Sequence, residues 1–325
     1  MTEPFAHSEH IVVLGGAGFI GSHTVVRLLE GGHRVSILDN LSTGSLDNLS
    51  EVQKHPDLRL FEVELQDSLW SGMQQATEAH GPIDRIILLA AQIAVPHSVA
   101  NPNYDARINY NTTWDVLEYA RIHNVKKVVF SSSSAVYGDT EALPIVESVE
   151  KQPLSPYGIN KYASEMALRY YWNVHNVPSA CLRFFNAYGP RQNPRSGYSG
   201  VISIFIDRAL AGKSLTIFGD GEQTRDFVYV GDVAHAILRA CFGDVQDGSA
   251  CNVSTNRAVT IRELAELIKK KAESNSEILY KDVRKGDILH SFASYQRAQE
   301  LLGFEPETSL EVGLEHTVAW CKTLD

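Results

Sequence analysis

The chain has 325 residues, of which 44% are hydrophobic and 21% are charged, as in ordinary globular proteins. Its formal net charge is −10 without a long basic run, which argues against nucleic acid as a partner, because phosphate backbones are bound by clustered Lys and Arg. No apolar run approaches the roughly 18 residues that a membrane span needs. The polar start, MTEPFAHSEH, is unlike a signal or transit peptide. We therefore expect a cytoplasmic protein that does not associate with membranes.

The cysteines are far apart in the sequence and form no CxxC pair. They are Cys181, Cys241, Cys251 and Cys321. This pattern indicates buried thiols in a reducing compartment rather than a disulfide framework or a zinc site. We expect no metal site.

Short apolar runs alternate with helix-length segments through the first half of the chain. The runs that we interpret as buried parallel strands are 11–14, 34–38, 58–61, 85–90, 126–130 and 179–184. Helical patterns lie between them at 19–30, 70–80 and 109–123. This alternation predicts an α/β fold with a doubly wound parallel sheet (a Rossmann fold), which binds ligands at the carboxyl ends of its strands.

The character of the sequence changes after residue 183. The stretch NAYGPRQNPRSGYSG is rich in Gly, Pro, Ser and Asn and predicts an ordered loop. Helical patterns follow at 201–211, 233–241, 261–274, 294–302 and 310–322. We expect residues 1–183, joined by segments returning near 225–255, to form the sheet domain. The remaining segments of 184–325 should form a smaller, mostly helical substrate lobe.

A glycine motif follows the first predicted strand and opens a helix. In GGAGFIGS, Gly15, Gly18 and Gly21 allow a tight turn, close approach of backbone amides to a pyrophosphate, and close helix–strand packing. The second predicted strand leads to Asp39, where a carboxylate can bind both ribose hydroxyls and would repel a 2′-phosphate. The sequence therefore predicts a dinucleotide site for NAD rather than NADP.

A tyrosine and a lysine are four residues apart in LSPYGINK. Ser155 is a plausible N-cap and Pro156 suits the first helical position, so Tyr157 and Lys161 should lie one turn apart on one helix face. An ammonium group near a phenol stabilises the phenolate and lowers its pKa from about 10 towards the working pH. Such a tyrosine can act as a general base.

These motifs together resemble one family. GGAGFIGS, Asp39, SSSSAVYGD and YGINK are similar to the extended short-chain dehydrogenase/reductases, and most closely to the NAD-dependent UDP-hexose 4-epimerases. The resemblance covers nearly the whole chain and includes RFFNAYGPRQNP, GVISIFIDRAL, FGDGEQTRDFVYVGDVA and RKGD. It implies that Tyr157 removes the O4 proton of a UDP-sugar while C4 passes a hydride to NAD. The 4-keto sugar then rotates and presents its other face to the cofactor. The hydride that returns to C4 therefore inverts it.

The resemblance also implies roles for individual residues. Ser133, aligned on AVYG, should hydrogen-bond O4 and relay its proton, so that the catalytic residues are Tyr157, Lys161 and Ser133. The residues expected to bind NAD are Gly15, Gly18, Phe19, Ile20, Gly21, Asp39, Asn40, Ser42, Thr43, Gly44, Glu64, Leu65, Leu89, Ala90, Ala91, Asn109, Tyr157 and Lys161. The residues expected to bind the UDP-sugar are Ser133, Ser134, Tyr157, Asn186, Arg195, Val201, Ile202, Thr216, Phe218, Arg225, Arg284, Asp287 and Ser291. Dimers that pair two helices from each subunit are common in the family, so we expect a homodimer.

Four positions depart from the family pattern. Glu64 stands where Asp is usual, and Leu14 replaces a common Thr. Ser291 occupies a gate position at which some relatives have a large tyrosine, so an N-acetylated sugar would find space. Arg195 could bind a carboxylate with two parallel hydrogen bonds. UDP-glucose/UDP-galactose 4-epimerase is thus the leading prediction, with UDP-N-acetylglucosamine 4-epimerase and UDP-glucuronate 4-epimerase as alternatives.

Two more distant functions are also considered. Nucleotide-sugar dehydratases and decarboxylases carry acidic residues beside the catalytic hydroxyl, whereas this chain has Ser134 and Ala135 there. A non-catalytic NAD-sensing protein typically loses the tyrosine or the lysine, and this chain keeps both Tyr157 and Lys161. An enzyme, an isomerase, is therefore favoured.

Overall fold

The structure is a computed structural model that describes residues 8–194, 200–283 and 288–324. Seven parallel strands form its main sheet in the order β11-β6-β5-β4-β1-β2-β3. Their bounds are His10–Leu14 (β1), Arg34–Asp39 (β2), Leu58–Glu62 (β3), Arg85–Leu88 (β4), Lys127–Ser133 (β5), Ser179–Phe184 (β6) and Asp247–Val253 (β11). The strand order reverses direction between β1 and β4, which is where doubly wound sheets bind their ligands. The predicted fold class is confirmed.

Helices cover both faces of this sheet. Helices α1 (Phe19–Glu30) and α8 (Val230–Phe242) pack on one face, and α2 (Leu65–His80), α5 (Thr112–His123) and α6 (Pro156–His175) pack on the other. Successive side chains of a strand point to opposite faces, so the alternating residues of β1 enter two separate cores. The side chains of both cores are almost fully buried.

Several element boundaries differ from the predicted ones. Helix α2 begins at Leu65 rather than at residue 70 and has a kink at Ser68. Helix α5 begins at Thr112, because Arg107–Asn111 forms a π-helical turn before it. Strand β5 continues to Ser133, three residues beyond the predicted end. This extension places Ser133 at the carboxyl edge of the sheet, and short helices α3 (Val95–Ala100) and α4 (Pro102–Ala106) follow β4 at the same edge.

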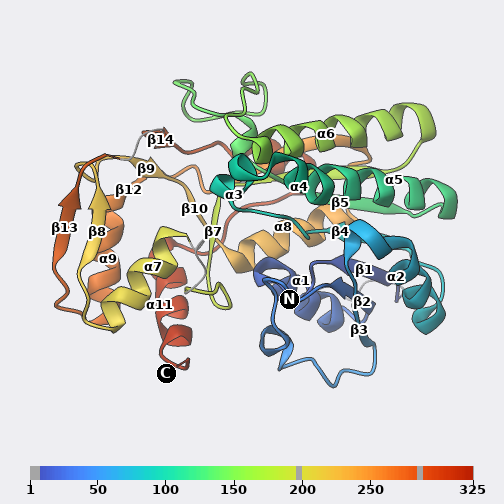
Figure 1. Cartoon of the computed structure of the whole chain (residues 1–325), viewed down its shortest axis with the longest axis horizontal. Helices are drawn as coiled ribbons and strands as arrows, with labels where there is room; N and C mark the ends of the chain where they lie inside the picture. The colour runs from blue at the N-terminus through green and yellow to red at the C-terminus, as the bar shows by residue number, and fades with distance from the viewer. Residues whose placement is uncertain (1–7, 195–199, 284–287, 325) are drawn as a thin grey trace.

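The C-terminal region combines helices with small sheets, as Figure 1 shows. Their buried side chains form a third core. Its helices are α7 (Val201–Leu210), α9 (Ile261–Ala272) and α11 (Leu310–Cys321), whereas α10 (Gln296–Leu302) packs in the core of the main sheet that α1 and α8 cover. Its short strands are β7 (Asn186–Tyr188), β8 (Leu215–Phe218), β9 (Thr224–Arg225), β10 (Phe227–Tyr229), β12 (Val259–Thr260), β13 (Ile278–Lys281) and β14 (His290–Ser291). Sequence analysis missed most of these strands, because two to four residues are too few to show an alternating pattern.

Two further findings concern the chain as a whole. The four cysteines are buried and form no disulfide bond within the described part of the chain, as predicted. Among the described residues, no helix is both long and apolar enough to cross a membrane.

Candidate active site

The turn after β1 has the geometry of a dinucleotide cradle. Gly15 has a φ of +83°, and a Cβ atom there would lie 2.6 Å from the backbone nitrogen of Ala90. A Cβ atom on Gly21 would lie 2.1 Å from the carbonyl oxygen of Gly15, so only glycine allows helix α1 to start this close to the strand. Gly18 is the N-cap of α1, and no side chain caps its first N–H groups. These N–H groups and the helix dipole are therefore available to a pyrophosphate, and this part of the site fits NAD.

Asp39 is held in place at the end of β2. It is 6% exposed, and its carboxylate accepts hydrogen bonds of 2.9 Å from the backbone N–H groups of Ala17 and Leu41. Burial raises the pKa of Asp39, and the two backbone hydrogen bonds oppose that effect. The carboxylate keeps lone pairs that can accept the two ribose hydroxyls. This arrangement also fits NAD.

Residues that follow Asp39 connect the loop after β2 to the loop after β3. The amide of Asn40 donates a 2.6 Å hydrogen bond to Glu64, and its oxygen accepts hydrogen bonds from the N–H and the hydroxyl of Ser42. Glu64 is the N-cap residue of α2 and Leu65 is the first residue of that helix. Thr43 is exposed and Gly44 packs against Ala17.

The loop after β4 is fixed by a buried polar cluster that sequence analysis missed. Leu89 and Ala90 donate their N–H groups to the carbonyl oxygen of Leu14, and Ala91 follows them at the same edge. Asn109 is 2% exposed and pairs with both backbone groups of Gln92. Asn109 thus supports this loop rather than presenting its amide to solvent.

Asp105 is the centre of that cluster. Its carboxylate is fully buried and accepts hydrogen bonds from the side chains of Gln92, Asn109 and Asn160, at 2.7, 3.0 and 2.7 Å. Asn160 lies on α6 between Tyr157 and Lys161. The cluster therefore connects the helix carrying the candidate base to the loop beside the cofactor cradle.

Tyr157 is positioned by the start of α6, as predicted. Ser155 is the N-cap, its hydroxyl accepts the N–H of Gly158 at 3.2 Å, and Pro156 occupies the first turn. A Cβ atom on Gly158 would lie 2.6 Å from the carbonyl oxygen of Ala135, so glycine lets α6 approach the loop after β5. This close contact brings Tyr157 to Ser133.

The expected catalytic residues do come together. Tyr157 lies beside Ser133, and Lys161 lies one turn further along α6. Lys161 is 2% exposed, and its Nζ donates a 2.7 Å hydrogen bond to the carbonyl oxygen of Ser131. The same Nζ lies 5.8 Å from the centroid of the Tyr157 ring. Ser133 is partly exposed, and so are Tyr157 and Ser134.

The expected lowering of the Tyr157 pKa is not found in the protein alone. Burial raises the pKa of Tyr157 to about 12, against the opposing hydrogen bond with Ser133, and the charge of Asp105 raises it further. Burial also lowers the pKa of Lys161 to about 8, although the charge of Asp105 opposes this. Burial thus has the largest effect on both pKa values, and Nζ bonds to the carbonyl oxygen of Ser131 rather than to the phenol.

A second buried network connects β5, the strand that carries Ser133, to α6 and β6. The hydroxyl of Ser132 donates a 2.5 Å hydrogen bond to Glu165, which pairs with Arg183 through two bonds of 2.6 and 2.9 Å. Arg183 also donates to the hydroxyl of Tyr137 at 2.7 Å. Sequence analysis did not single out these residues, although Glu165 follows Lys161 by one turn on the same helix.

Three expected substrate residues are adjacent in the structure. Ser291 pairs with Arg225 in parallel strands β14 and β9, and Asn186 pairs with Phe227 in β7 and β10. The amide of Asn186 donates to the carbonyl oxygen of Asp226 at 2.8 Å. All three side chains are exposed or partly exposed. They form one surface beside the carboxyl edge of β6.

Asp226 organises this surface. Its buried carboxylate accepts hydrogen bonds from Thr255, from Asn256 and from the N–H of Ala293, which lies two residues after Ser291. Burial raises the pKa of Asp226 to about 6, against the opposing effect of these hydrogen bonds. Sequence analysis quoted the TRDF segment without assigning this role.

The remaining expected substrate residues lie further along the C-terminal region. Thr216 and Phe218 are partly exposed on β8, and Val201 is the partly exposed first residue of α7. Ile202 is 1% exposed and packs in the third core. Any contact of Ile202 with a nucleotide must therefore come from its backbone, because its side chain is enclosed. Arg195, Arg284 and Asp287 lie outside the described residues.

Residues 11–253 match the NAD dependent epimerase/dehydratase family. The chain belongs to this family. NAD is accordingly its cofactor, as the glycine turn and Asp39 predicted, and the family resemblance stated from the sequence is confirmed.

Individual relatives are similar over almost the whole chain. A putative UDP-glucose 4-epimerase from Methanocaldococcus jannaschii is 40% identical over 313 residues, which cover 96% of this chain and 98% of the relative. The structure of UDP-glucose 4-epimerase with UDP-glucose from Thermotoga maritima is 40% identical, with a TM-score of 0.90 and coverage of 97% and 100%. The structure of UDP-N-acetylglucosamine 4-epimerase from Methanobrevibacter ruminantium, in complex with UDP-N-acetylmuramic acid, is 36% identical. Its TM-score is 0.91 and the coverage is 98% and 99%.

Proposed function

We propose that this protein is a UDP-sugar 4-epimerase that interconverts UDP-glucose and UDP-galactose. The observation that carries the proposal is the position of Tyr157 beside Ser133, one helical turn before buried Lys161, whose Nζ lies 5.8 Å from the centroid of the Tyr157 ring. Relatives named as UDP-glucose 4-epimerases at 40% identity support the same reaction.

Ser133, Tyr157 and Lys161 have different proposed roles in the transfer of the O4 proton. When bound, NAD supplies the chemistry of accepting a hydride from C4 and returning it. Ser133 is placed to hydrogen-bond O4 and pass its proton to Tyr157, which acts as the base. Lys161, held by the carbonyl oxygen of Ser131, places a positive charge behind the phenol. Because the same proton returns to O4 after the keto sugar has turned over, Tyr157 then acts as the acid.

The surface of Asn186, Arg225 and Ser291 is the proposed anchor for the UDP moiety. A diphosphate needs cationic and amide donors, which Arg225 and Asn186 can supply, and the amide of Asn186 bonds to the carbonyl oxygen of Asp226, the residue after Arg225. Thr216 and Phe218 on β8 are proposed to flank the uracil. A firmly held nucleotide would leave the sugar free to turn.

Ser291 favours one alternative substrate. Its small, partly exposed side chain leaves room beside Arg225 for a larger C2 substituent, so UDP-N-acetylglucosamine is the second candidate. A relative at 36% identity carries the name of that activity. UDP-glucuronate remains a candidate on the strength of Arg195 in the sequence alone.

The direct test is conversion of UDP-galactose to UDP-glucose without added NADH. The proposal predicts turnover with the cofactor neither consumed nor released. A panel of UDP-galactose, UDP-N-acetylgalactosamine and UDP-galacturonate, run with wild type and Arg195→Ala, then ranks the sugars. Loss on the uronate alone would assign the arginine to a carboxylate. No conversion of any UDP-sugar by the NAD-loaded protein would instead favour a sensor.

A homodimer through α5 and α6 is also proposed. These two helices pack side by side, and α6 exposes Ile159, Tyr170 and Val174 at 53%, 46% and 55%. Helix α5 adds Ile122 at 48%. Apolar side chains gathered on neighbouring helices are typical of a subunit interface. Light scattering should give the mass of two chains for wild type and of one for Val174→Glu, and a monomeric wild type would exclude the dimer.

A further inference from the structure

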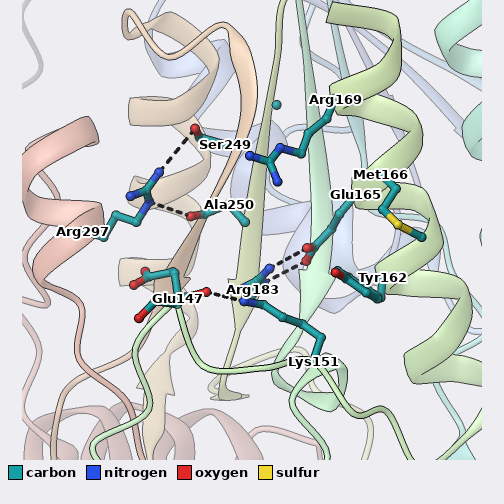
Figure 2. Close-up of a pocket in the computed structure, with 12 residues that line it drawn as sticks. Glu147, Lys151, Tyr162, Glu165, Met166, Arg169, Arg183, Ser249, Ala250 and Arg297 are labelled. Atoms are coloured by element: carbon teal, nitrogen blue, oxygen red, sulfur yellow. Dashed lines mark hydrogen bonds and ion pairs between the residues drawn. The ribbon is translucent and has the colours of Figure 1, made fainter. Parts of the chain in front are cut away.

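A basic cavity lies outside the site described above. Its volume is about 230 Å³, and it lies between α6, the segment 147–151, the start of β11 and α10 (Figure 2). Three cationic side chains surround it, each from a different element: Lys151, Arg169 and Arg297. The guanidinium group of Arg169 points into the space, as Figure 2 shows.

None of these three cations has a carboxylate partner among the residues that the structure describes. Lys151 donates to the carbonyl oxygen of Glu147. Arg297 donates to the carbonyl oxygen of Ala250 at 3.2 Å and to the hydroxyl of Ser249 at 3.4 Å. Arg169 forms no ion pair in the described part of the chain, and its charge acts on Asp247 only as a minor influence that lowers the pKa of that carboxyl.

The two carboxylates in the cavity wall already have partners. Glu165 is held by both arms of Arg183, and Glu147 accepts the N–H of Asn252 at 2.7 Å. Counting Arg183, the wall has four cations against two carboxylates, which leaves two positive charges. Such an excess is unusual in a chain with a net charge of −10, because like charges held together repel unless an anion lies between them.

We propose that this cavity binds a small phosphate-bearing anion, either free phosphate or a phosphate monoester. Guanidinium groups bind phosphate oxygens through paired hydrogen bonds, and two positive charges match a phosphate dianion. The volume is below the range of roughly 300–1,000 Å³ that drug-sized ligands occupy, so the ligand must be small. It would connect α6 to α10 and to the segment leading to Ser155.

The site does not depend on the identity of the sugar substrate. Tyr162, Glu165 and Arg169 line it from α6, but Tyr157 and Lys161 do not. A bound anion should therefore stabilise the fold by linkage, since only the folded state assembles the three cations.

The test is calorimetric titration of the NAD-loaded protein with inorganic phosphate and with glucose 1-phosphate. We expect a dissociation constant on the order of 1 mM for the better ligand, typical of a few charge-assisted hydrogen bonds in a half-open site. Tighter binding of the ester would assign a monoester, and equal binding would assign phosphate itself. Wild type should also melt at a higher temperature in the presence of the ligand.

The variants identify where binding occurs. Arg169→Ala and Arg297→Ala should each weaken binding by about tenfold, and Arg169→Lys by less, because the charge remains. The matched control is Arg59→Ala, which removes an exposed arginine on β3, at the opposite edge of the sheet, that donates to the carbonyl oxygens of Pro56 and Leu58. It should bind like wild type. Absence of binding to wild type, or equal binding by wild type and both alanine variants, would overturn the proposal. Circular dichroism checks that each variant is folded.

Discussion

Ser132 in β5 and Glu165 in α6 join the two elements that carry Ser133 and Tyr157 through a 2.5 Å hydrogen bond. Ser132 directly precedes Ser133 in β5, and Glu165 lies one turn after Lys161 in α6. The carboxylate that accepts this bond is also neutralised by Arg183 from β6. Three neighbouring elements are thus fixed relative to one another by one buried acid.

Replacing this acid should destabilise the protein. Glu165→Gln removes the charge opposite Arg183, whose side chain is only 5% exposed. Leaving a buried charge without its partner typically costs about 3–5 kcal/mol, so the midpoint of urea unfolding should fall clearly. The turnover number should fall as well, because Ser133 loses its fixed neighbour. Glu263→Gln is the control, since its ion pair with Arg257 is on the surface. Equal effects of the two substitutions would exclude a special role for Glu165.

Removing the phenolic oxygen should stop catalysis without releasing the cofactor. Tyr157→Phe keeps the ring but loses the proton acceptor, so turnover should fall by at least about 10²–10⁴-fold. Bound NAD, measured by absorbance after gel filtration, should remain at the wild-type level. Tyr170→Phe removes a phenol from the exposed face of the same helix and should change neither quantity. Activity near wild type in Tyr157→Phe would show that another group is the base.

The glycine after Tyr157 is predicted to be required for its position. In an ordinary helix, Gly→Ala stabilises by up to about 1 kcal/mol. In Gly158→Ala, however, the new Cβ would lie 2.6 Å from the carbonyl oxygen of Ala135, so α6 must move away from the loop beside Ser133. We expect lower thermal stability and a lower turnover number. A variant that is more stable and equally active would show that the contact relaxes without cost.

Much of this arrangement was predictable from the sequence, and the missing parts share a cause. The strands β1 to β6, the helix α1 and the cap at Ser155 have local signals of periodicity and capping. Glu165 and Asp226 have none, because their partners lie 18 to 67 residues away in the sequence. The burial of such acids can be recognised only from the three-dimensional structure, because the residues that enclose them are far away in the sequence.

The raised pKa of Tyr157 shows the same limit. A Tyr-Lys spacing of four residues predicts that the two side chains are close. It does not show which hydrogen-bond acceptor the lysine ammonium group binds. In the structure Lys161 bonds to the carbonyl oxygen of Ser131, and burial determines the pKa of the phenol. The sequence thus predicted that Tyr157 and Lys161 lie one helical turn apart, but not that burial would raise the pKa of the phenol in the protein alone.

The stability of the protein should depend on pH through Asp226. Its pKa is raised to about 6, above the value of about 3.9 in an unfolded chain, so between these values the folded state holds the proton more tightly. Its contribution therefore favours folding at low pH and decreases by about 2–3 kcal/mol as the pH rises through about 4 to 6. Subtracting the unfolding free energies of Asp226→Asn from those of wild type over this range should reveal the decrease. A difference that is independent of pH would contradict it.

The proposed mechanism requires that Tyr157 can act as a base. The protein alone holds its pKa near 12, and the positive nicotinamide ring of bound NAD should stabilise the phenolate together with Lys161. The decisive measurement is the ultraviolet titration of phenolate in the NAD-loaded enzyme, taken as the difference between wild type and Tyr157→Phe. We predict a pKa at least about two units below 12 in the loaded enzyme. A pKa that stays near 12 with NAD bound would contradict the assignment of Tyr157 as the base.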